Sequence, residues 1–438
     1  MKKVVIITYY WPPAGGPGVQ RVLKFARYLP RFGWQPIVLT VSRGEYPALD
    51  PTLEAEVPSA CKVYRTPSLE PGPIFRRFVG MPRESRIQIG VLAEKPDNWR
   101  KRVAFWIRTN LVIPDAKVGW LPFAVRKGLA IIQKEKPHLL FSSSPPPTVH
   151  LIAKQLARNT KLKWVADFRD PWTDIHYYEH RKRLPCSRRM DEKLEAGVLR
   201  EADRLVFVSK RDIDLSFSRK VNASKCVHLP NGYDEADFQS ISFPPPSPDR
   251  FVLMHVGAAG SERNPQNLFR VLRTLLTEAV ISPTGFRLVF VGPISESVLH
   301  SIQREGVSSL IERIDYVPHR RALQLAAGAT ALLLLITRSS QNRRILPGKT
   351  FEYIRLKKPI LALGPPGGEV DQILQETNAG RVLDYADREG IEKQLRSWIR
   401  QWQKGRLAYS GHIPSIRKYS RERLTQQLAA IFDQICEG

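Results

Sequence analysis

Short apolar, β-branched runs alternate with helix-period segments along almost the whole chain, and this alternation restricts the fold more than any other feature. In the first half, strands are expected at 3–8, 36–41, 138–142, 163–167 and 204–208, with helices near 16–32, 120–135, 147–159 and 188–202. In the second half, strands are expected near 251–257, 286–292, 313–317, 331–336, 359–363 and 380–383, with helices near 264–279, 295–305, 319–327, 348–357, 368–376 and 388–403. Strands that alternate with helices form parallel sheets with right-handed crossovers. We therefore predict the α/β class, with two Rossmann-like, doubly wound parallel-sheet domains facing a central cleft.

The length of 438 residues exceeds one ordinary hydrophobic core, so two domains are expected. A proline-rich stretch at 243–248 has the composition of a stiff linker. We predict an N-terminal domain at 1–240 with a basic and aromatic insertion near 70–125. A second domain should follow at 241–410, and a C-terminal helix at 411–438 is expected to pack back on the first domain.

No run approaches the roughly 20 apolar residues that a membrane-spanning helix needs. The apolar run 4–7 is too short for a signal-peptide core. The four cysteines are scattered and form no C-x-x-C pair, which fits a reducing cytosol without a metal or disulfide framework. A cytoplasmic protein is therefore expected.

The formal net charge of +26 favours anionic partners, namely nucleic acid, anionic lipid, sugar nucleotides or phosphorylated glycans. No RNP, zinc-finger or helix-turn-helix pattern is present, so nucleic acid is not favoured. Between Arg76 and Lys127 there are 12 Lys/Arg against 4 Asp/Glu, interleaved with Trp99, Trp106 and Trp120. This mixture predicts peripheral attachment to an anionic membrane surface; a solvated insertion with a few core anchors is the alternative.

A glycine-rich turn, Gly15-Gly16, follows the first strand and opens a helix. Such a turn lets backbone approach a phosphate closely. It matches neither G-x-G-x-x-G nor the Walker A motif, and a simple strand-to-helix turn is the alternative.

A second helix start, Pro347-Gly348-Lys349-Thr350, is followed by Glu352. Free N–H groups and the positive end of the helix dipole favour an anion there. A lysine in that turn is a poor partner for the dipole, and a bound diphosphate would explain its presence. Glu352 could then accept hydrogen bonds from ribose or sugar hydroxyls. An ordinary helix start with two solvated charges is the alternative.

Taken together, the order of motifs resembles the large retaining family 4 of GT-B glycosyltransferases over nearly the whole length. The motifs are the Gly15-Gly16 loop, Val206–Lys210, Leu229–Asp234, His255–Gly257, Phe290–Pro293 and Lys349–Pro359. Ile113–Trp120 and Ala166–Trp172 resemble a bacterial subgroup that acts on cell-surface glycans.

The resemblance implies that 1–240 is the acceptor domain and 241–410 the nucleotide-sugar domain. On the donor side, it implies that Arg263, six positions after the strand-end Gly257, contacts the donor diphosphate. The family's basic partner residue, directly after that glycine, is Ala258 here. Glu352 matches the acidic residue that binds the nucleotide ribose. Its usual acidic companion eight positions earlier is Arg344, a departure that leaves Lys349 to supply the phosphate contact.

The resemblance also places His319 against the nucleotide base, although a helix N-terminal residue is the alternative for it. Gly348 and Thr350 are expected at the donor as well. On the acceptor side, the family's His-Asp pair maps onto Arg169-Asp170, and Trp172 is expected nearby.

Breaking a sugar–diphosphate bond places negative charge on the leaving phosphate, which Arg263 and Lys349 can stabilise without a divalent metal. The only D-x-D spacing, Asp212-Ile213-Asp214, lies in an expected helix, so no metal cofactor is predicted. Asp167 and Asp170 end a strand, where a carboxylate could orient or deprotonate the acceptor. The alternative for Asp167 is a structural ion pair, with Arg169 as the expected partner.

We therefore predict a hexosyltransferase that moves a sugar from a nucleotide-diphosphate sugar to a lipid-linked or cell-surface polysaccharide acceptor, with retention. It should be cytoplasmic, with peripheral attachment to the inner face of the plasma membrane as a further expectation. A catalytically silent scaffold of the same fold, a sugar-nucleotide epimerase and a phosphorylase are the alternatives.

Overall fold

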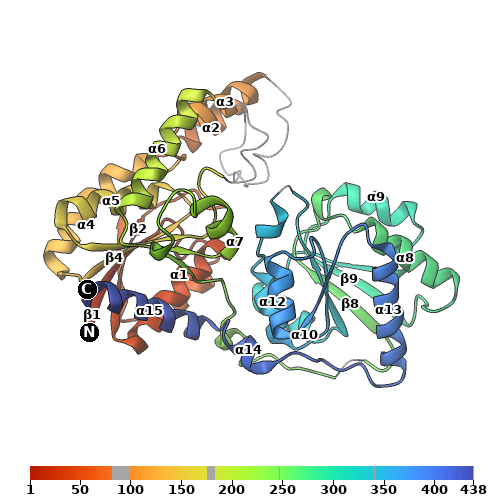
Figure 1. Ribbon diagram of the computed structural model, residues 1–438. Coiled ribbons are helices and arrows are strands. Elements are labelled where there is room, and N and C mark those ends of the chain that lie inside the picture. Colours follow the sequence, from red (N-terminus) through yellow and green to blue (C-terminus); the bar gives the residue numbers. More distant parts are fainter. Residues whose placement is uncertain (81–98, 175–182, 246, 340, 438) are drawn as a thin grey trace. The chain divides into compact units, whose positions relative to one another are not determined.

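The computed structural model describes residues 1–80, 99–174, 183–245, 247–339 and 341–437 (Figure 1). The chain forms two compact units. Unit 1 contains Met1–Pro230 together with Arg421–Gly438, and unit 2 contains Asn231–Ser420. Part of the predicted basic and aromatic insertion, residues 81–98, falls outside the described residues.

Unit 1 is built on a seven-stranded sheet in the order β3-β2-β1-β4-β5-β6-β7, and all of its strand pairs are parallel. The strands are β1 (Lys2–Ile7), β2 (Trp34–Val41), β3 (Lys62–Thr66), β4 (Leu139–Ser144), β5 (Lys163–Phe168), β6 (Arg204–Phe207) and β7 (Cys226–His228). The helices are α1 (Pro17–Tyr28), α2 (Gly72–Val79), α3 (Trp99–Asn110), α4 (Leu121–Glu135), α5 (Thr148–Thr160), α6 (Pro185–Glu201), the short α7 (Lys210–Asp212) and α15 (Arg421–Glu437).

The two faces of this sheet are covered by different helices. Val4 and Ile6 of β1 pack in a core with α1 and α15. Val5 and Ile7, which alternate with them along the strand, pack in a second core with α4, α5 and α6. Figure 1 shows α15 lying beside α1, so the C-terminal segment completes one face of the first sheet.

Helix α1 also buries two charged residues, although its apolar pattern assigned Arg21 and Lys24 to other faces. Arg21 is 0% exposed and donates two hydrogen bonds to Asp167 of β5, at 2.8 and 3.0 Å. Its guanidinium also donates to the carbonyls of Leu229 and Pro230, while Ser143 donates to the Asp167 carboxylate. Buried charges persist only when they are paired and hydrogen-bonded in this way.

Unit 2 is built on a six-stranded sheet in the order β10-β9-β8-β11-β12-β13, again with only parallel pairs. The strands are β8 (Phe251–Val256), β9 (Phe286–Val291), β10 (Ile311–Ile314), β11 (Ala331–Leu335), β12 (Ile360–Leu363) and β13 (Gly380–Leu383). The helices are α8 (Gln266–Thr277), α9 (Glu296–Arg304), α10 (His319–Ala327), α11 (Lys349–Leu356), α12 (Glu369–Thr377), α13 (Arg388–Gln403) and α14 (Ile413–Arg417).

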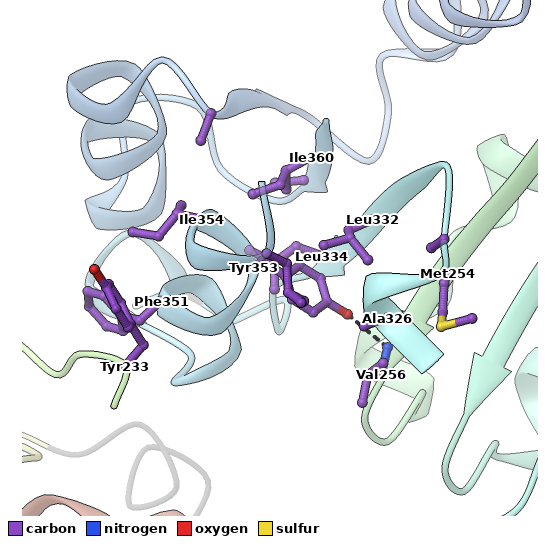
Figure 2. Close-up of a cluster of buried hydrophobic side chains, with 14 of the residues drawn as sticks. Tyr233, Met254, Val256, Ala326, Leu332, Leu334, Phe351, Tyr353, Ile354 and Ile360 are labelled. Carbon is purple, nitrogen blue, oxygen red and sulfur yellow. Dashed lines mark hydrogen bonds between the residues drawn. The ribbon is translucent and has the colours of Figure 1, made fainter. Parts of the chain in front are cut away.

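The second sheet is layered in the same way as the first. One core joins it to α10, α11 and α12, and the other joins it to α8, α9 and α13. Figure 2 shows the first of these cores, in which the Tyr353 side chain of α11 reaches the end of β8. There the backbone N–H of Val256 donates a hydrogen bond of 2.8 Å to the Tyr353 hydroxyl.

The predicted fold class is confirmed, because both units are α/β layers on parallel sheets. The strands β3 and β7 were not predicted: β3 is partly exposed and β7 has three residues, so neither carries a strong apolar run. The break between the units lies at 230/231, whereas the linker composition indicated 240/241.

We predict that Asp167→Asn destabilises unit 1 by about 3–5 kcal/mol, because it leaves the Arg21 guanidinium buried without its counter-charge. The free energy of unfolding is measured by urea titration. Tryptophan fluorescence reports mainly on unit 1, because seven of the nine tryptophans lie at or before Trp172.

The matched control is Asp170→Asn, since this neighbouring carboxylate is exposed. It should change the stability by about 0.5 kcal/mol or less. Equal effects of the two variants would contradict the assigned importance of the buried pair.

Candidate donor-binding site

The ends of β8 and β9 in unit 2 approach each other through two glycines. Gly257 and Gly292 follow these strands and have φ angles of 137° and 122°. A Cβ atom on Gly292 would lie 2.9 Å from the carbonyl oxygen of Gly257. Glycine is therefore needed at both positions, and it leaves backbone accessible at the edge where ligands of such sheets bind.

Arg263 lies in a short 3-10 turn, Ser261–Arg263, after β8. Its Nε donates to the Thr337 hydroxyl at 2.9 Å, and its Nη1 donates to the Ala258 carbonyl at 3.3 Å. Thr337 follows β11, so two neighbouring strand ends hold this guanidinium in place. Sequence patterns did not indicate Thr337, which lies outside any motif of the resemblance.

Three of the predicted residues form one cluster at the start of α11. The Lys349 Nζ lies 2.8 Å from one carboxylate oxygen of Glu352, and the His319 Nε2 lies 3.1 Å from the other. His319 begins α10, so the cluster joins two helices. The Glu352 side chain is 20% exposed and remains accessible to a ligand.

Electrostatics keeps this carboxylate ionised. Burial acts to raise the pKa of Glu352, but the positive charges and hydrogen bonds of Lys349 and His319 outweigh it and lower the pKa to about 2. Burial lowers the pKa of His319, but the hydrogen bond and negative charge of Glu352 act more strongly together, so this pKa is raised. Glu352 is therefore a permanent hydrogen-bond acceptor at neutral pH.

A buried histidine, His255, lies near the end of β8, two residues before Gly257. Its ring is 3% exposed, and its Nδ1 lies 3.0 Å from the carbonyl oxygen of Leu333. Burial is the main cause that lowers its pKa to about 4, and the positive charges of Arg263 and Lys349 act in the same direction. The charges of both cations therefore act on one buried imidazole. The motif His255–Gly257 contributes to the family resemblance, but the sequence did not predict His255 as a site residue.

Gly348 and Thr350 differ in what the structure requires of them. Gly348 has φ −56°, and a Cβ there would meet nothing within 4 Å, so no steric reason demands glycine. Thr350 is fully buried, and among the described residues its hydroxyl has no hydrogen-bond partner. Arg344, in place of the expected acid, ends a 3-10 turn shortly before α11.

In unit 1, the Gly15-Gly16 turn packs closely against another loop. The N–H of Gly15 donates to the Ala48 carbonyl at 2.9 Å, and Gly16 has φ 89°. Arg169, directly after β5, donates to the carbonyls of Gly18, Ser144 and Pro145. Its guanidinium therefore fixes the glycine-rich loop to the ends of β4 and β5.

The other predicted acceptor-side residues lie at different depths. Asp170 is exposed, whereas Asp167 is buried with Arg21 as its partner instead of Arg169. Trp172 is 3% exposed, and its Nε1 donates to Asp191 at 2.8 Å. A direct contact of Asp167 or Trp172 with an acceptor would require either side chain to leave these partners.

Within the described ranges, no three His, Cys, Asp or Glu side chains lie close enough to hold a metal ion. Asp212, from the D-x-D spacing, is buried in a short helix capped by the Ser209 hydroxyl. No helix among the described residues is long and apolar enough to cross a bilayer.

Comparison with known proteins identifies the class. Residues 15–232 match the family model of the glycosyl transferase 4-like domain. No curated protein sequence matches the chain.

Solved structures with this fold match along almost the whole chain. Sucrose-phosphate synthase from Thermosynechococcus elongatus has a TM-score of 0.65 at 12% identity, covering 99% of both chains. HepE from Anabaena, in complex with UDP and glucose, has a TM-score of 0.62 at 13% identity, covering 99% of this chain and 100% of its own. The lipopolysaccharide outer core galactosyltransferase WaaB has a TM-score of 0.57 at 13% identity, covering 99% of both chains.

The chain therefore has the GT-B fold and resembles family 4, and it is a glycosyltransferase, as predicted.

We predict that Glu352→Gln lowers the pKa of His319 below its ordinary value of 6.5, because burial then acts without the carboxylate. NMR titration of the imidazole nitrogens measures this pKa. Since the folded-state pKa is raised, the contribution of His319 to stability is complete below about pH 6.5 and disappears as the pH rises through the raised value. The control Glu312→Gln, on the exposed side of β10, should leave the His319 titration unchanged; an unchanged titration in Glu352→Gln as well would contradict the cluster.

Proposed function

We propose that this glycosyltransferase transfers a hexose from a nucleotide-diphosphate sugar to a lipid-linked or cell-surface polysaccharide acceptor, with retention at the anomeric carbon. The observation that carries the donor assignment is the cluster of Lys349, Glu352 and His319 at the start of α11. The cluster supplies the groups that bind a nucleotide diphosphate: a cation, Lys349, for the phosphates and an ionised carboxylate, Glu352, for the sugar hydroxyls.

Each residue then has a definite chemical task. Arg263 and Lys349 stabilise the negative charge that develops on the leaving diphosphate. Glu352 accepts hydrogen bonds from the ribose hydroxyls, and His319 lies beside the base. The glycines at 257 and 292 give the diphosphate close access to backbone. Two side-chain cations make a divalent metal unnecessary for leaving-group stabilisation, so we propose a metal-independent reaction.

Proteins of the same fold support the choice of substrates. HepE is described in complex with UDP and with UDP-glucose. WaaB and WaaG are described as lipopolysaccharide glycosyltransferases. A nucleotide-sugar donor and a glycan acceptor on the cell surface follow this pattern, and a lipid-linked acceptor would bring the enzyme to the inner face of the plasma membrane. On unit 1, the exposed Asp170 beside the fixed Arg169 is our candidate for the acceptor contact.

A catalytically silent scaffold is the second candidate, and one observation favours it. Arg344 and Ala258 replace an acidic and a basic residue that the family resemblance leads us to expect at the donor. Donor hydrolysis assayed with a panel of sugar nucleotides separates the two candidates. Hydrolysis of any donor supports the enzyme. Binding of donors without hydrolysis of any of them supports the scaffold.

We predict that Lys349→Ala and Arg263→Ala each lower donor turnover at least about a hundredfold, the usual effect of removing one transition-state charge stabiliser. Turnover is measured by release of nucleoside diphosphate, and circular dichroism verifies the fold of each variant. Arg313→Ala removes an exposed cation of β10 and should retain full turnover. All rates should persist in excess chelator. Near-normal turnover of both site variants, or a magnesium-reversible loss with chelator, would contradict this chemistry.

We also predict that Glu352→Gln weakens nucleoside diphosphate binding by about 1.5–3 kcal/mol, the usual contribution of hydrogen bonds to a charged group. Calorimetric titration measures the dissociation constant. For the unmodified enzyme, the Glu352 contribution should be constant from neutral pH down to about pH 4, because its pKa is about 2. Unchanged affinity in the variant would show that ribose is bound elsewhere.

A further inference from the structure

Helix α3 of unit 1 exposes an apolar stripe of the kind that an ordinary surface helix buries. Trp99, Val103 and Trp106 are separated by four and three residues, so they form one stripe along the helix. An amphipathic helix normally buries such a stripe. Here Trp99 is 64% exposed and Trp106 is 47% exposed, while the buried position on α3 between them is the small Ala104.

The exposed apolar surface continues beyond this stripe. Ile107 extends it toward the end of α3, and the exposed Leu111 directly follows that helix. The ring of Phe78 on α2 lies edge-on to the Trp99 ring, with 6.3 Å between the ring centroids. The N-terminal end of α6 adds exposed Leu184 and Met190. Of the fourteen large apolar side chains that are strongly exposed in the described residues, eight lie on α2, on α3 with the residue that follows it, or at the start of α6. A concentration of this kind indicates an interaction site.

Two contacts fix α3 to α6. The Leu184 N–H donates to the Asn110 side chain at 2.7 Å, and the Ser187 hydroxyl donates to the Asn110 carbonyl at 2.8 Å. Figure 1 shows α2 and α3 beside the N-terminal end of α6. The apolar side chains of the three helices are thus held on a folded support.

The charge of this surface identifies the partner. Helices α2 and α3 contain six basic residues and no acidic residue. Arg100 and Arg102, both exposed, flank the stripe on either side of the Trp99 position, given 100° per residue. Long basic side chains at these positions can reach the lipid headgroups while the tryptophans lie among them.

We propose that this surface, formed by α2, α3 and the start of α6, is the site at which the protein docks on an anionic lipid bilayer, with α3 lying in the plane of the interface. A second copy of the chain would bring two sets of basic residues together without compensation. Nucleic acid would leave the aliphatic Val103, Ile107 and Leu111 without a partner. An anionic interface satisfies both the charges and the apolar side chains.

The docking surface extends the proposed function, since it would hold the enzyme where lipid-linked acceptors are found. Its test is independent of sugar transfer. The full chain is co-sedimented with vesicles of phosphatidylcholine alone and of phosphatidylcholine mixed with phosphatidylglycerol. We expect binding to the mixed vesicles that decreases with salt, because the Debye length falls from about 10 Å at 0.1 M to about 3 Å at 1 M.

Two double variants separate the contributions. Trp99→Ser with Trp106→Ser should lower the partition coefficient at least tenfold at every salt concentration. Arg100→Gln with Arg102→Gln should lower it several-fold at low salt only. The matched controls, Leu215→Ser and Arg313→Gln, remove an exposed leucine and an exposed arginine elsewhere and should bind like the unmodified protein.

Three results would overturn the proposal: no binding of the unmodified protein to mixed vesicles, equal binding to both vesicle types, or binding unaffected by either double variant. Light scattering without lipid tests the remaining occupant. A dimer that the tryptophan variant dissociates would assign the surface to a second copy of the chain. Donor hydrolysis without vesicles should be the same in all variants, so failure of docking and failure of the proposed function are distinguishable.

Discussion

The hydrogen bond from the Val256 N–H to the Tyr353 hydroxyl positions the helix that carries the candidate donor-site residues. It joins the end of β8, just before Gly257, to the middle of α11, one turn after Lys349. Burial of Tyr353 raises the pKa of its hydroxyl, which therefore stays protonated. Because Lys349 and Glu352 belong to the same short helix, this contact and the packing of α11 in the core together position both residues at the sheet edge. The cluster with His319 can then form only in the neighbourhood of His255 and Arg263.

Unit 1 has the same architecture, but the charged groups at its strand ends are buried. Its strand ends carry a fully buried ion pair, Arg21–Asp167, whose remaining polar atoms are satisfied by backbone carbonyls and Ser143. Arg169, two residues later, is likewise held by carbonyls. These groups position loops, whereas Glu352 and Lys349 in unit 2 remain partly exposed and available. The same edge of a parallel sheet is thus a rigid support in one unit and the candidate ligand site in the other.

The predictability of these features from sequence follows from how local each one is. The apolar strands and amphipathic helices depend on neighbouring residues, so most were predicted within a few positions, whereas β3, β7, α2 and α3 were not predicted. Glu352 and Lys349 share one helix turn, which makes their pairing readable from spacing. Arg21 and Asp167 are 146 residues apart, and Arg21 looks like any solvated residue on an amphipathic helix. Asp167 was therefore assigned to the acceptor side, and its partner could emerge only from the three-dimensional structure. Trp172 is buried as well, and a tryptophan in a polar loop carries no sequence signal for the buried Asp191 that accepts its N–H.

Helix α3 shows the converse limit. Its basic and aromatic composition predicted an interfacial segment, yet composition does not say which side of a helix faces solvent. The pattern of Trp99, Val103 and Trp106 alone would place these residues in a core. Only the burial of Ala104 and the attachment of Asn110 to α6 show that the stripe points outward. The positive charge of the chain therefore differs in its arrangement between the two units. On α3 basic residues flank exposed apolar side chains, whereas in unit 2 Lys349 lies against the Glu352 carboxylate at the candidate donor site.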